Sequence, residues 1–502
     1  MTRRGGCYQV LCVLCVLMTA AGCAPTRSEY YSSLERRRVE SFRRWESHSR
    51  KDERPRVDGE LSLEEAVRLA LLYNPQLQAA LQQKEVARGR VKESYSVALP
   101  TVNVSAGYIR MDELIAPGVG SLNNYSLRVT VTQPLFSGSM TIAQRAARLY
   151  AFLSDEGVRQ AVEVLVYGVG RGYLDAVVSQ QLVGMYEDAL LSADAHFKVV
   201  EARRDEGVAT EYDVLRARVD VSNTQADLIE QKRLRDISRT GLLRALGVDQ
   251  DSQVDLITPL TYDDQEPPSF AEAVQAAFYN RPDIYQAAIA LDLQELALRD
   301  AKTRWWPRLD AYFWDMLASP DPHGSSGSWG TQWQAGLGLM WTAFDGLARE
   351  GRIIQQQALL RQSEIQLDDA EQQVLLELRD ALLELQSARE LVESQKLNLE
   401  RANRALELVI EAYNEKVRTE VEVLDAQAAL TRAKALHYGA LHRHASAKLA
   451  LRRAMGFLSS PPGAESVPQK VENLTDISLP AAPAAGAGGP AQPTEGETPQ
   501  TE

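Results

Sequence analysis

The most regular alternation of hydrophobic and polar positions in this chain lies between residues 329 and 341. Trp329, Trp333, Ala335, Leu337 and Trp341 all stand at odd numbers, and the even-numbered positions from 330 to 338 are glycine or glutamine. A period of two places such residues on one face of a β-strand. Shorter alternations of the same kind occur elsewhere in the chain. We predict four strands, at about 101–110, 123–133, 307–316 and 329–342.

Helical periodicity replaces this alternation in two very long stretches, 138–205 and 345–414, and neither contains a proline. In the second stretch apolar residues recur every seven positions from Ile353 to Val374, and again from Leu378 onward after a shift of four. Heptad spacing with one such stutter is typical of a coiled coil. Because about seventy helical residues span roughly 105 Å, both stretches predict long rods.

Shorter helices accompany each long one. Ser62, with Glu65 three residues later, predicts a capped helix start near residue 61, and a second helix should run from Pro75 to about Leu99. A last helix should return antiparallel in each half of the chain and end at a glycine, as helices commonly do. These returning helices are expected at about 210–246 and 419–455, before Gly247 and Gly456.

The two halves of the chain carry the same signals in the same order. Glu65 has a counterpart 207 residues later in Glu272, and the segment that begins at Glu206 has one 209 residues later, at Glu415. So constant an offset indicates a tandem duplication. We therefore divide the chain into repeat 1 at 61–250, a linker at 251–267 and repeat 2 at 268–458.

The N-terminus has the pattern of a secretion signal. Basic residues precede an apolar run from Val10 to Met18, which is too short to span a membrane. The Ala-Ala-Gly-Cys23 sequence that follows resembles a bacterial lipobox. We predict a lipoprotein signal peptide at 1–22 with lipidation of Cys23; the alternative is a plain signal peptide and an unmodified Cys23. A lipid-anchored arm at 23–60 and a disordered tail at 459–502 complete the chain.

Composition excludes several classes of function. The net charge is −13, and no basic patch alternates with aromatics as in a nucleic-acid-binding protein. All four cysteines lie within the first 23 residues, so the rest of the chain offers no thiolate metal site. We find no nucleophile elbow, P-loop or dinucleotide fingerprint, and expect neither enzyme activity nor a cofactor. His437, His442 and His444 suggest a metal site only superficially, and we expect solvated or packed histidines.

Four strands cannot close into a barrel, and open strand edges are not tolerated in lipid. If the strands span a membrane, the chain must oligomerise. A dimer would supply eight strands with a filled interior, whereas a trimer would supply twelve and leave a lumen. The pattern therefore predicts an α+β membrane protein, a trimeric tube with strands at one end and helices at the other. An amphipathic strand in a soluble sheet is the alternative.

The doubled order of motifs resembles the TolC-type outer-membrane efflux family, specifically its lipoprotein members. The resemblance covers about 61–458 and is carried by segment 61–75, by Leu99-Pro100, by segment 133–138 and by the repeated Val-x-Thr turn. It implies a homotrimer with a 12-stranded transmembrane β-barrel, four strands per chain, continuous with a long antiparallel coiled-coil α-helical barrel in the periplasm. It also implies a periplasmic adaptor and an inner-membrane transporter of RND, ABC or MFS type as partners, besides outer-membrane lipid.

The resemblance further implies a periplasmic gate at the turns between the long helices. The motif that supplies the family's acidic ring stands here as Glu422-Val-Leu-Asp425, and the latch residues fall on Tyr413, Arg418 and Asp213. Crowded carboxylates favour cations, and an arginine–carboxylate pair holds well yet can exchange. A solvated helix face with i, i+4 pairs is the alternative. The tip residues expected to contact the adaptor are Gly207, Val208, Thr210, Lys416, Val417 and Thr419.

Two positions depart from the family pattern at this turn. Lys416 replaces a glycine, and Glu422 replaces an aspartate. The function implied is a passive exit duct for small molecules such as drugs and toxic compounds, driven by the inner-membrane pump. Two alternatives stay open: the outer-membrane duct of a type I protein secretion system, and a lipid-anchored coiled-coil envelope scaffold without a pore.

Overall fold

The computed structural model describes residues 27–46, 55–111, 122–262, 264–319, 329–415 and 417–459. The chain divides into one unit, Met1–Ser459, and a second, Ser460–Glu502, which lies outside the described residues. The expected signal peptide, Cys23, Lys416 and the C-terminal tail also lie outside them. Helix α2 (Arg27–Glu46) is described within the expected arm. No helix in the described ranges combines the length and the apolarity needed to cross a membrane.

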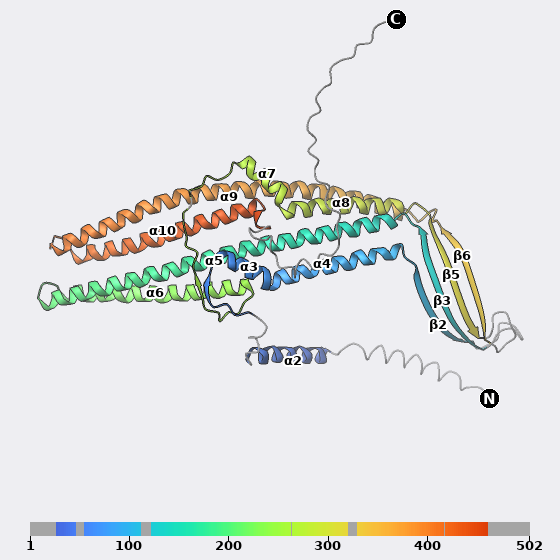
Figure 1. Cartoon of the computed structure of the whole chain (residues 1–502), viewed down its shortest axis with the longest axis horizontal. Helices are drawn as coiled ribbons and strands as arrows, with labels where there is room; N and C mark the ends of the chain where they lie inside the picture. Colours follow the sequence, from blue (N-terminus) through green and yellow to red (C-terminus); the bar gives the residue numbers. More distant parts are fainter. Residues whose placement is uncertain are drawn as a thin grey trace, which may run out of the picture. The chain divides into compact units, whose positions relative to one another are not determined.

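Two very long helices run through the first unit (Figure 1). Helix α5 (Met140–Asp205) returns through α6 (Glu211–Leu246), and α9 (Ala348–Asn414) returns through α10 (Glu420–Ala454). The predicted heptad seam of α9 is confirmed, because its central positions are buried and its outer positions are half-buried. These central residues are Val374, Leu378, Leu385 and Val392.

Shorter helices lie beside the N-terminal ends of the long ones, α4 against α5 and α8 against α9. Ser62 accepts a hydrogen bond from the Glu65 backbone N–H, and the equivalent Ser269 and Glu272 cap each other in both directions. Helix α4 ends at Ser94, before the expected Leu99, because a 3₁₀ turn follows it. These shorter helices are α3 (Leu63–Tyr73), α4 (Pro75–Ser94), α7 (Phe270–Asn280) and α8 (Pro282–Thr303).

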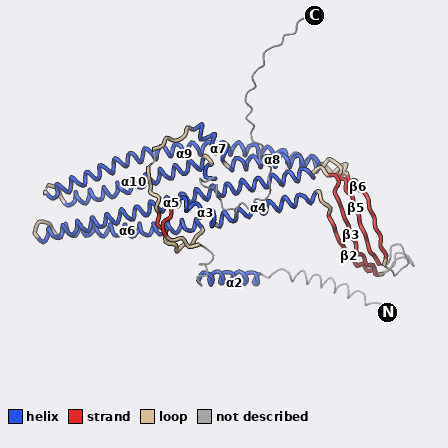
Figure 2. Tube along the Cα trace, in the orientation of Figure 1, coloured by secondary structure: helices blue, strands red, loops and turns tan. Residues whose placement is uncertain are grey.

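An antiparallel sheet with the strand order β2-β3-β5-β6 follows the shorter helices (Figure 2). The register sets Val129 opposite Val104, and Leu309 opposite both Phe136 and Leu339, so most apolar residues of the four strands share one face. Tyr312, Trp314 and Met316 of β5 lie on the other face. Strand β3 continues past the expected residue 133 because pairing resumes after an irregularity at Pro134. The strands are β2 (Thr101–Arg110), β3 (Asn123–Phe136), β5 (Arg308–Ser319) and β6 (Gly330–Met340).

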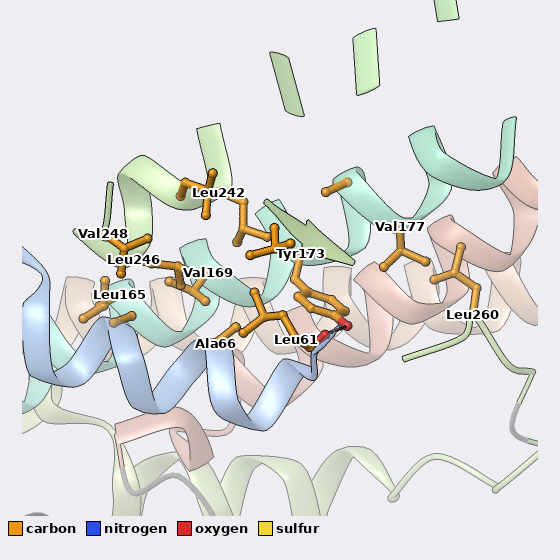
Figure 3. Packing of buried hydrophobic residues seen from close by; sticks show 14 of the residues in the cluster. Leu61, Ala66, Leu165, Val169, Tyr173, Val177, Leu242, Leu246, Val248 and Leu260 are labelled. Atoms are coloured by element: carbon orange, nitrogen blue, oxygen red, sulfur yellow. Dashed lines mark hydrogen bonds between the residues drawn. The ribbon is translucent and has the colours of Figure 1, made fainter. Parts of the chain in front are cut away.

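The main hydrophobic core surrounds Tyr173 of α5 (Figure 3). Its hydroxyl donates to the Leu61 carbonyl at 2.8 Å and accepts from the Thr258 backbone N–H at 3.1 Å. Strands β1 (Gly59–Leu61) and β4 (Val254–Leu256) pair in parallel beside it. The end of the expected arm and the start of the expected linker thus join this core, because their backbone groups bond to each other and to the buried tyrosine.

Three glycines stand in the middle of α5, and one of them makes a close contact. A Cβ atom on Gly170 would lie 2.8 Å from Leu449 Cδ2 of α10, whereas one on Gly168 would meet nothing within 4 Å. A Cβ atom on Gly172 would only touch Leu242, at 3.9 Å. Gly170 therefore lets α5 and α10, from the two halves of the chain, approach each other closely.

Candidate functional site at the helix turns

The turn between α5 and α6 is built on a left-handed glycine. Gly207 has φ +71°, and the Val208 N–H donates to the Arg203 carbonyl at 2.8 Å. This arrangement satisfies the last carbonyls of α5, as expected of a glycine beyond a helix end. Nothing lies within 4 Å of where a Gly207 Cβ would stand, and Val208 is exposed. The tip of this turn is therefore open to a partner surface.

Helix α6 begins with a reciprocal cap. The Thr210 hydroxyl accepts from the Asp213 backbone N–H, while Asp213 Oδ2 accepts from the Thr210 backbone N–H at 2.9 Å. The same carboxylate oxygen accepts from the Thr210 hydroxyl at 2.7 Å. Asp213 therefore caps the start of α6, the helix to which it belongs.

The turn between α9 and α10 repeats this design with an added arginine. The backbone N–H of Thr419 donates to Glu422 Oε2 at 2.8 Å, and Arg418 Nη1 donates to Glu422 Oε1. These hydrogen bonds, first the backbone one and then that of Arg418, hold the pKa of the Glu422 carboxyl below its usual range. Val417 stands exposed at the tip, and Asp425 is exposed one turn further along α10.

A buried polar layer lies behind the two turns and joins the halves of the chain. His196 Nε2 of α5 lies 2.5 Å from Glu420 Oε1 of α10, and both side chains are at most 10% exposed. The Arg203 guanidinium sits over the Tyr413 ring at 4.2 Å from the ring centre. Burial, and then the Glu420 carboxylate, raise the pKa of Tyr413 to about 12. Burial likewise raises the pKa of the neighbouring Asp220 carboxyl.

The predicted latch residues are not joined to one another within a single chain. Asp213 caps α6, Arg418 pairs with Glu422, and Tyr413 packs against Arg203 and the buried Glu420. The i, i+4 pair of Arg418 and Glu422 is the one that the alternative interpretation expected. A latch through these residues requires a neighbouring copy of the chain or another state of the turns, and it stays a prediction.

Sequence reasoning missed His196, Arg203 and Glu420. The partners in the His196–Glu420 contact are 224 residues apart in the chain, and Arg203 Nη2 reaches Asn414 Oδ1 across 211 residues. Neither contact follows from local spacing. The tandem repeat offered one signal. Because it aligns the two turns with each other, it predicts that the residues next to each turn lie at the same level along the long helices.

Two of the remaining histidines of the described ranges, His442 and His444, are paired or packed. His442 Nε2 lies 2.7 Å from Asp175 Oδ1, a partner on α5 that sequence analysis did not anticipate. His444 is buried with its ring 5.0 Å from that of Tyr262. Within the described ranges no group of three or more histidine, cysteine or acidic residues is placed to hold a metal ion.

Comparison with known families adds a decisive observation to this geometry. The family model described as outer membrane efflux protein matches residues 66–248 and again residues 273–457. The chain belongs to the outer membrane efflux protein family. Each match covers one set of short helices, strands and long helices, so the family pattern is present once in each half.

Individual proteins and a solved structure are also similar to this chain. The chain is 24% identical over 338 residues to the outer membrane efflux protein BepC of Brucella suis, covering 66% of this chain and 72% of that protein. It is 22% identical to the alkaline protease secretion protein AprF of Pseudomonas aeruginosa, covering 74% and 79% of the respective chains. A solved membrane protein of Pseudomonas aeruginosa shares its fold with a TM-score of 0.69, at 21% identity, over 78% of this chain and 92% of that one.

Proposed function

We propose that this efflux protein is the outer-membrane exit duct of a tripartite efflux system, through which small molecules leave passively under the drive of an inner-membrane pump. The observation that carries the proposal is the exposed apolar face shared by four strands at the end of the long helices. Val104, Leu337 and Leu339 on this face are each more than half exposed in the single chain. Such a face needs lipid or a partner to cover it.

Three copies of the chain complete the proposed duct. A sheet with open edges does not persist in lipid, so the four strands of each copy should join those of two others in a closed barrel of twelve. The long helices then continue this wall into the periplasm as a coiled-coil barrel, where the turns at Gly207 and Val417 meet a periplasmic adaptor. Lipidation of Cys23 would anchor each copy to the membrane as well.

Channel activity and assembly test this proposal together. Purified full-length protein should run as a detergent-resistant trimer and conduct ions in planar bilayers. A strain that lacks the protein should gain susceptibility to toxic small molecules and lose it again on complementation. A monomer without conductance would instead support the envelope scaffold, although a scaffold has no use for the apolar strand face.

Export of polypeptides is the second candidate, and similarity to a protease secretion protein favours it. The two candidates share the same fold and differ in the pump that supplies the duct. Comparing secreted proteins of the deletion strain and its parent separates them. Loss of a secreted protein with unchanged susceptibility to small molecules would replace efflux by protein secretion.

A further inference from the structure

A cavity lies where the strands meet the helices. This junction is at the opposite end of the long helices from the α5–α6 and α9–α10 turns (Figure 1). Its volume is about 560 Å³, within the range of small-ligand sites. Residues from the start of α5, the end of α8, the start of β5 and the start of α9 line it. The proposed duct mechanism makes no use of this cavity.

The lining of the cavity is strongly cationic. Four arginines and only two aspartates line it, which leaves a formal charge of +2. Arg308 is paired with Asp310, and Arg304 lies 3.7 Å from Asp300. Arg352 is exposed and forms no ion pair with any residue of the described ranges. Since Arg349 pairs with Asp345, three of the four lining arginines have a carboxylate partner, and Arg352 leaves one positive charge without one in the described ranges. The lining arginines are Arg304, Arg308, Arg349 and Arg352.

Arg349 is held by several contacts, and one of its N–H donors has no hydrogen-bond partner among the described residues. Its side chain is 4% exposed, its Nε donates to Asp345 Oδ2 at 3.0 Å and its Nη2 to the Ala343 carbonyl at 3.1 Å. The guanidinium also stacks 4.1 Å from the centre of the Trp305 ring. Its buried Nη1 has no hydrogen-bond partner among the described residues. A buried cationic donor without a partner costs free energy unless a ligand satisfies it.

Both long helices begin at this cavity, and their N-termini add positive potential. Ser139, which precedes α5, forms no side-chain cap bond, and neither does Leu347, which precedes α9. Leu347 is the non-glycine residue with positive φ, +71°, in the described ranges, a conformation that is unfavourable for a residue with a side chain. The start of α9 is already capped by a carboxylate, because the Arg349 backbone N–H donates to Asp345 Oδ2 at 3.1 Å. The Arg349 Nη1 donor, which has no partner among the described residues, is therefore the group best suited to an oxyanion, beside the start of α5.

The surroundings of the cavity indicate which anion it takes. Trp306 lines the cavity and stacks on Phe136, with ring centres 6.2 Å apart. Phe136 pairs with Leu309 on the apolar face of the sheet, so this side of the cavity borders that face. Trp341 is also exposed here and donates from Nε1 to the Trp305 carbonyl. Tryptophans beside basic residues at the end of an apolar face are typical of the headgroup level of a membrane.

We propose that this cavity binds the phosphodiester headgroup of an anionic phospholipid, with Arg349 Nη1, Arg352 and the start of α5 as its donors. The inference rests on the proposed placement of the sheet in the outer membrane. Bidentate arginine–phosphate contacts are short and charge-assisted, and the exposed aromatic residues next to the cavity lie where acyl chains would run. One lipid per chain would thus fasten the junction between strands and helices.

Native mass spectrometry of the full-length, delipidated protein tests the site. The probes are phosphatidylglycerol and phosphatidylcholine with identical acyl chains, added to the same detergent, with inorganic phosphate as a competitor. Wild type should retain one phosphatidylglycerol per chain, about tenfold more tightly than phosphatidylcholine. Arg352→Gln should remove most of this preference. Arg349→Lys should weaken it, because lysine keeps the positive charge but lacks the planar guanidinium that binds phosphate with two N–H groups.

Arg361→Gln is the matched control, since Arg361 is exposed on the same helix, outside the cavity lining, and has no ion pair in the described ranges. It should bind lipid as wild type does. Equal retention of the two lipids, or equal loss in Arg352→Gln and Arg361→Gln, would overturn the proposal. Displacement by inorganic phosphate at equal affinity would also overturn it, in favour of a soluble anion. Conductance of the wild-type protein in planar bilayers tests the exit-duct function independently. A failure of the lipid site can therefore be told apart from a failure of the proposed function.

Discussion

Glycine at the helix ends serves two different purposes, which single substitutions can separate. Gly207 and Gly247 both have positive φ, but only Gly247 is also in close contact: a Cβ there would lie 2.3 Å from the Tyr73 carbonyl oxygen. Gly207→Ala should cost about 1 kcal/mol of conformational strain. Gly247→Ala should cost about 1–3 kcal/mol more, because backbone must move in the core.

Thermal melting of the purified oligomer, followed by circular dichroism, compares the two variants. The midpoint of Gly247→Ala should lie clearly below that of Gly207→Ala, which should lie slightly below wild type. Equal midpoints would mean that the end of α3 moves away from Gly247 at little cost.

Tyr413 and Arg418 are the residues through which we expect the gate to open. In the single chain Arg418 reaches Glu422 at the start of α10, while Tyr413 packs on Arg203 of α5 and so joins the two turns. The double variant Tyr413→Phe with Arg418→Ser should raise single-channel conductance in planar bilayers severalfold, because it removes the Tyr413 hydroxyl and the Arg418–Glu422 ion pair. Arg404→Ser, which breaks the exposed Arg404–Glu407 pair on the same helix, is the control and should conduct as wild type does. Unchanged conductance of the double variant would count against the gate.

At the scale of elements, a buried arginine ties three helices together. Arg281, at the start of α8, bonds to Asp283, to Glu377 of α9 at 2.7 Å and to the Ala454 carbonyl of α10 at 3.2 Å. Because the arginine is buried, Arg281→Met should lower the free energy of unfolding by on the order of 3 kcal/mol, leaving carboxylates unpaired. Urea melts at neutral pH measure this, with the exposed Arg299→Met as a control that should change little.

The ion pair between Arg281 and Asp283 also predicts how the stability of the protein depends on pH. Burial alone would raise the pKa of Asp283, but the hydrogen bonds and charge of Arg281 outweigh it and hold this pKa below its usual range. A lowered folded-state pKa gives stability that is present above the unfolded value of 3.8 and is lost as pH falls through the folded value. Asp283→Asn should therefore flatten the acid limb of a plot of melting temperature against pH below about 4. An acid limb identical to that of wild type would assign the acid loss to other carboxylates.

The sequence predicted the elements better than the contacts between them. Strand β2 occupies the expected residues 101–110 because its alternation is uninterrupted, whereas β3 runs beyond 133 because pairing across Pro134 depends on its partner β5. The cap of Ser62 on the Glu65 N–H was predicted from local spacing and is confirmed. His196 and Glu420 were not predicted, since their contact joins helices from opposite halves of the chain.

At the scale of the whole molecule, the proposed duct depends on which face of the sheet meets lipid. The register places Leu337 on the apolar face and Gln334 on the opposite one, and both belong to β6. Leu337→Arg should therefore prevent assembly in the outer membrane, because an arginine facing lipid costs about 2–4 kcal/mol in each copy near the bilayer midplane. Gln334→Arg should assemble, since an arginine facing a water-filled lumen pays no such cost.

Cell fractionation, together with the amount of detergent-resistant trimer on gels, distinguishes these two arginine variants. The comparison is sharp because the introduced residue, the strand and the exposed class of both positions are matched, and the two positions lie on opposite faces of the sheet. A trimer of Leu337→Arg as abundant as that of Gln334→Arg would mean that the apolar face does not lie in lipid. The face would then be covered by protein, and the envelope scaffold would become the better account of this chain. Loss of the Leu337→Arg trimer alone would place the apolar face toward lipid and leave the polar face of the strands to line the lumen.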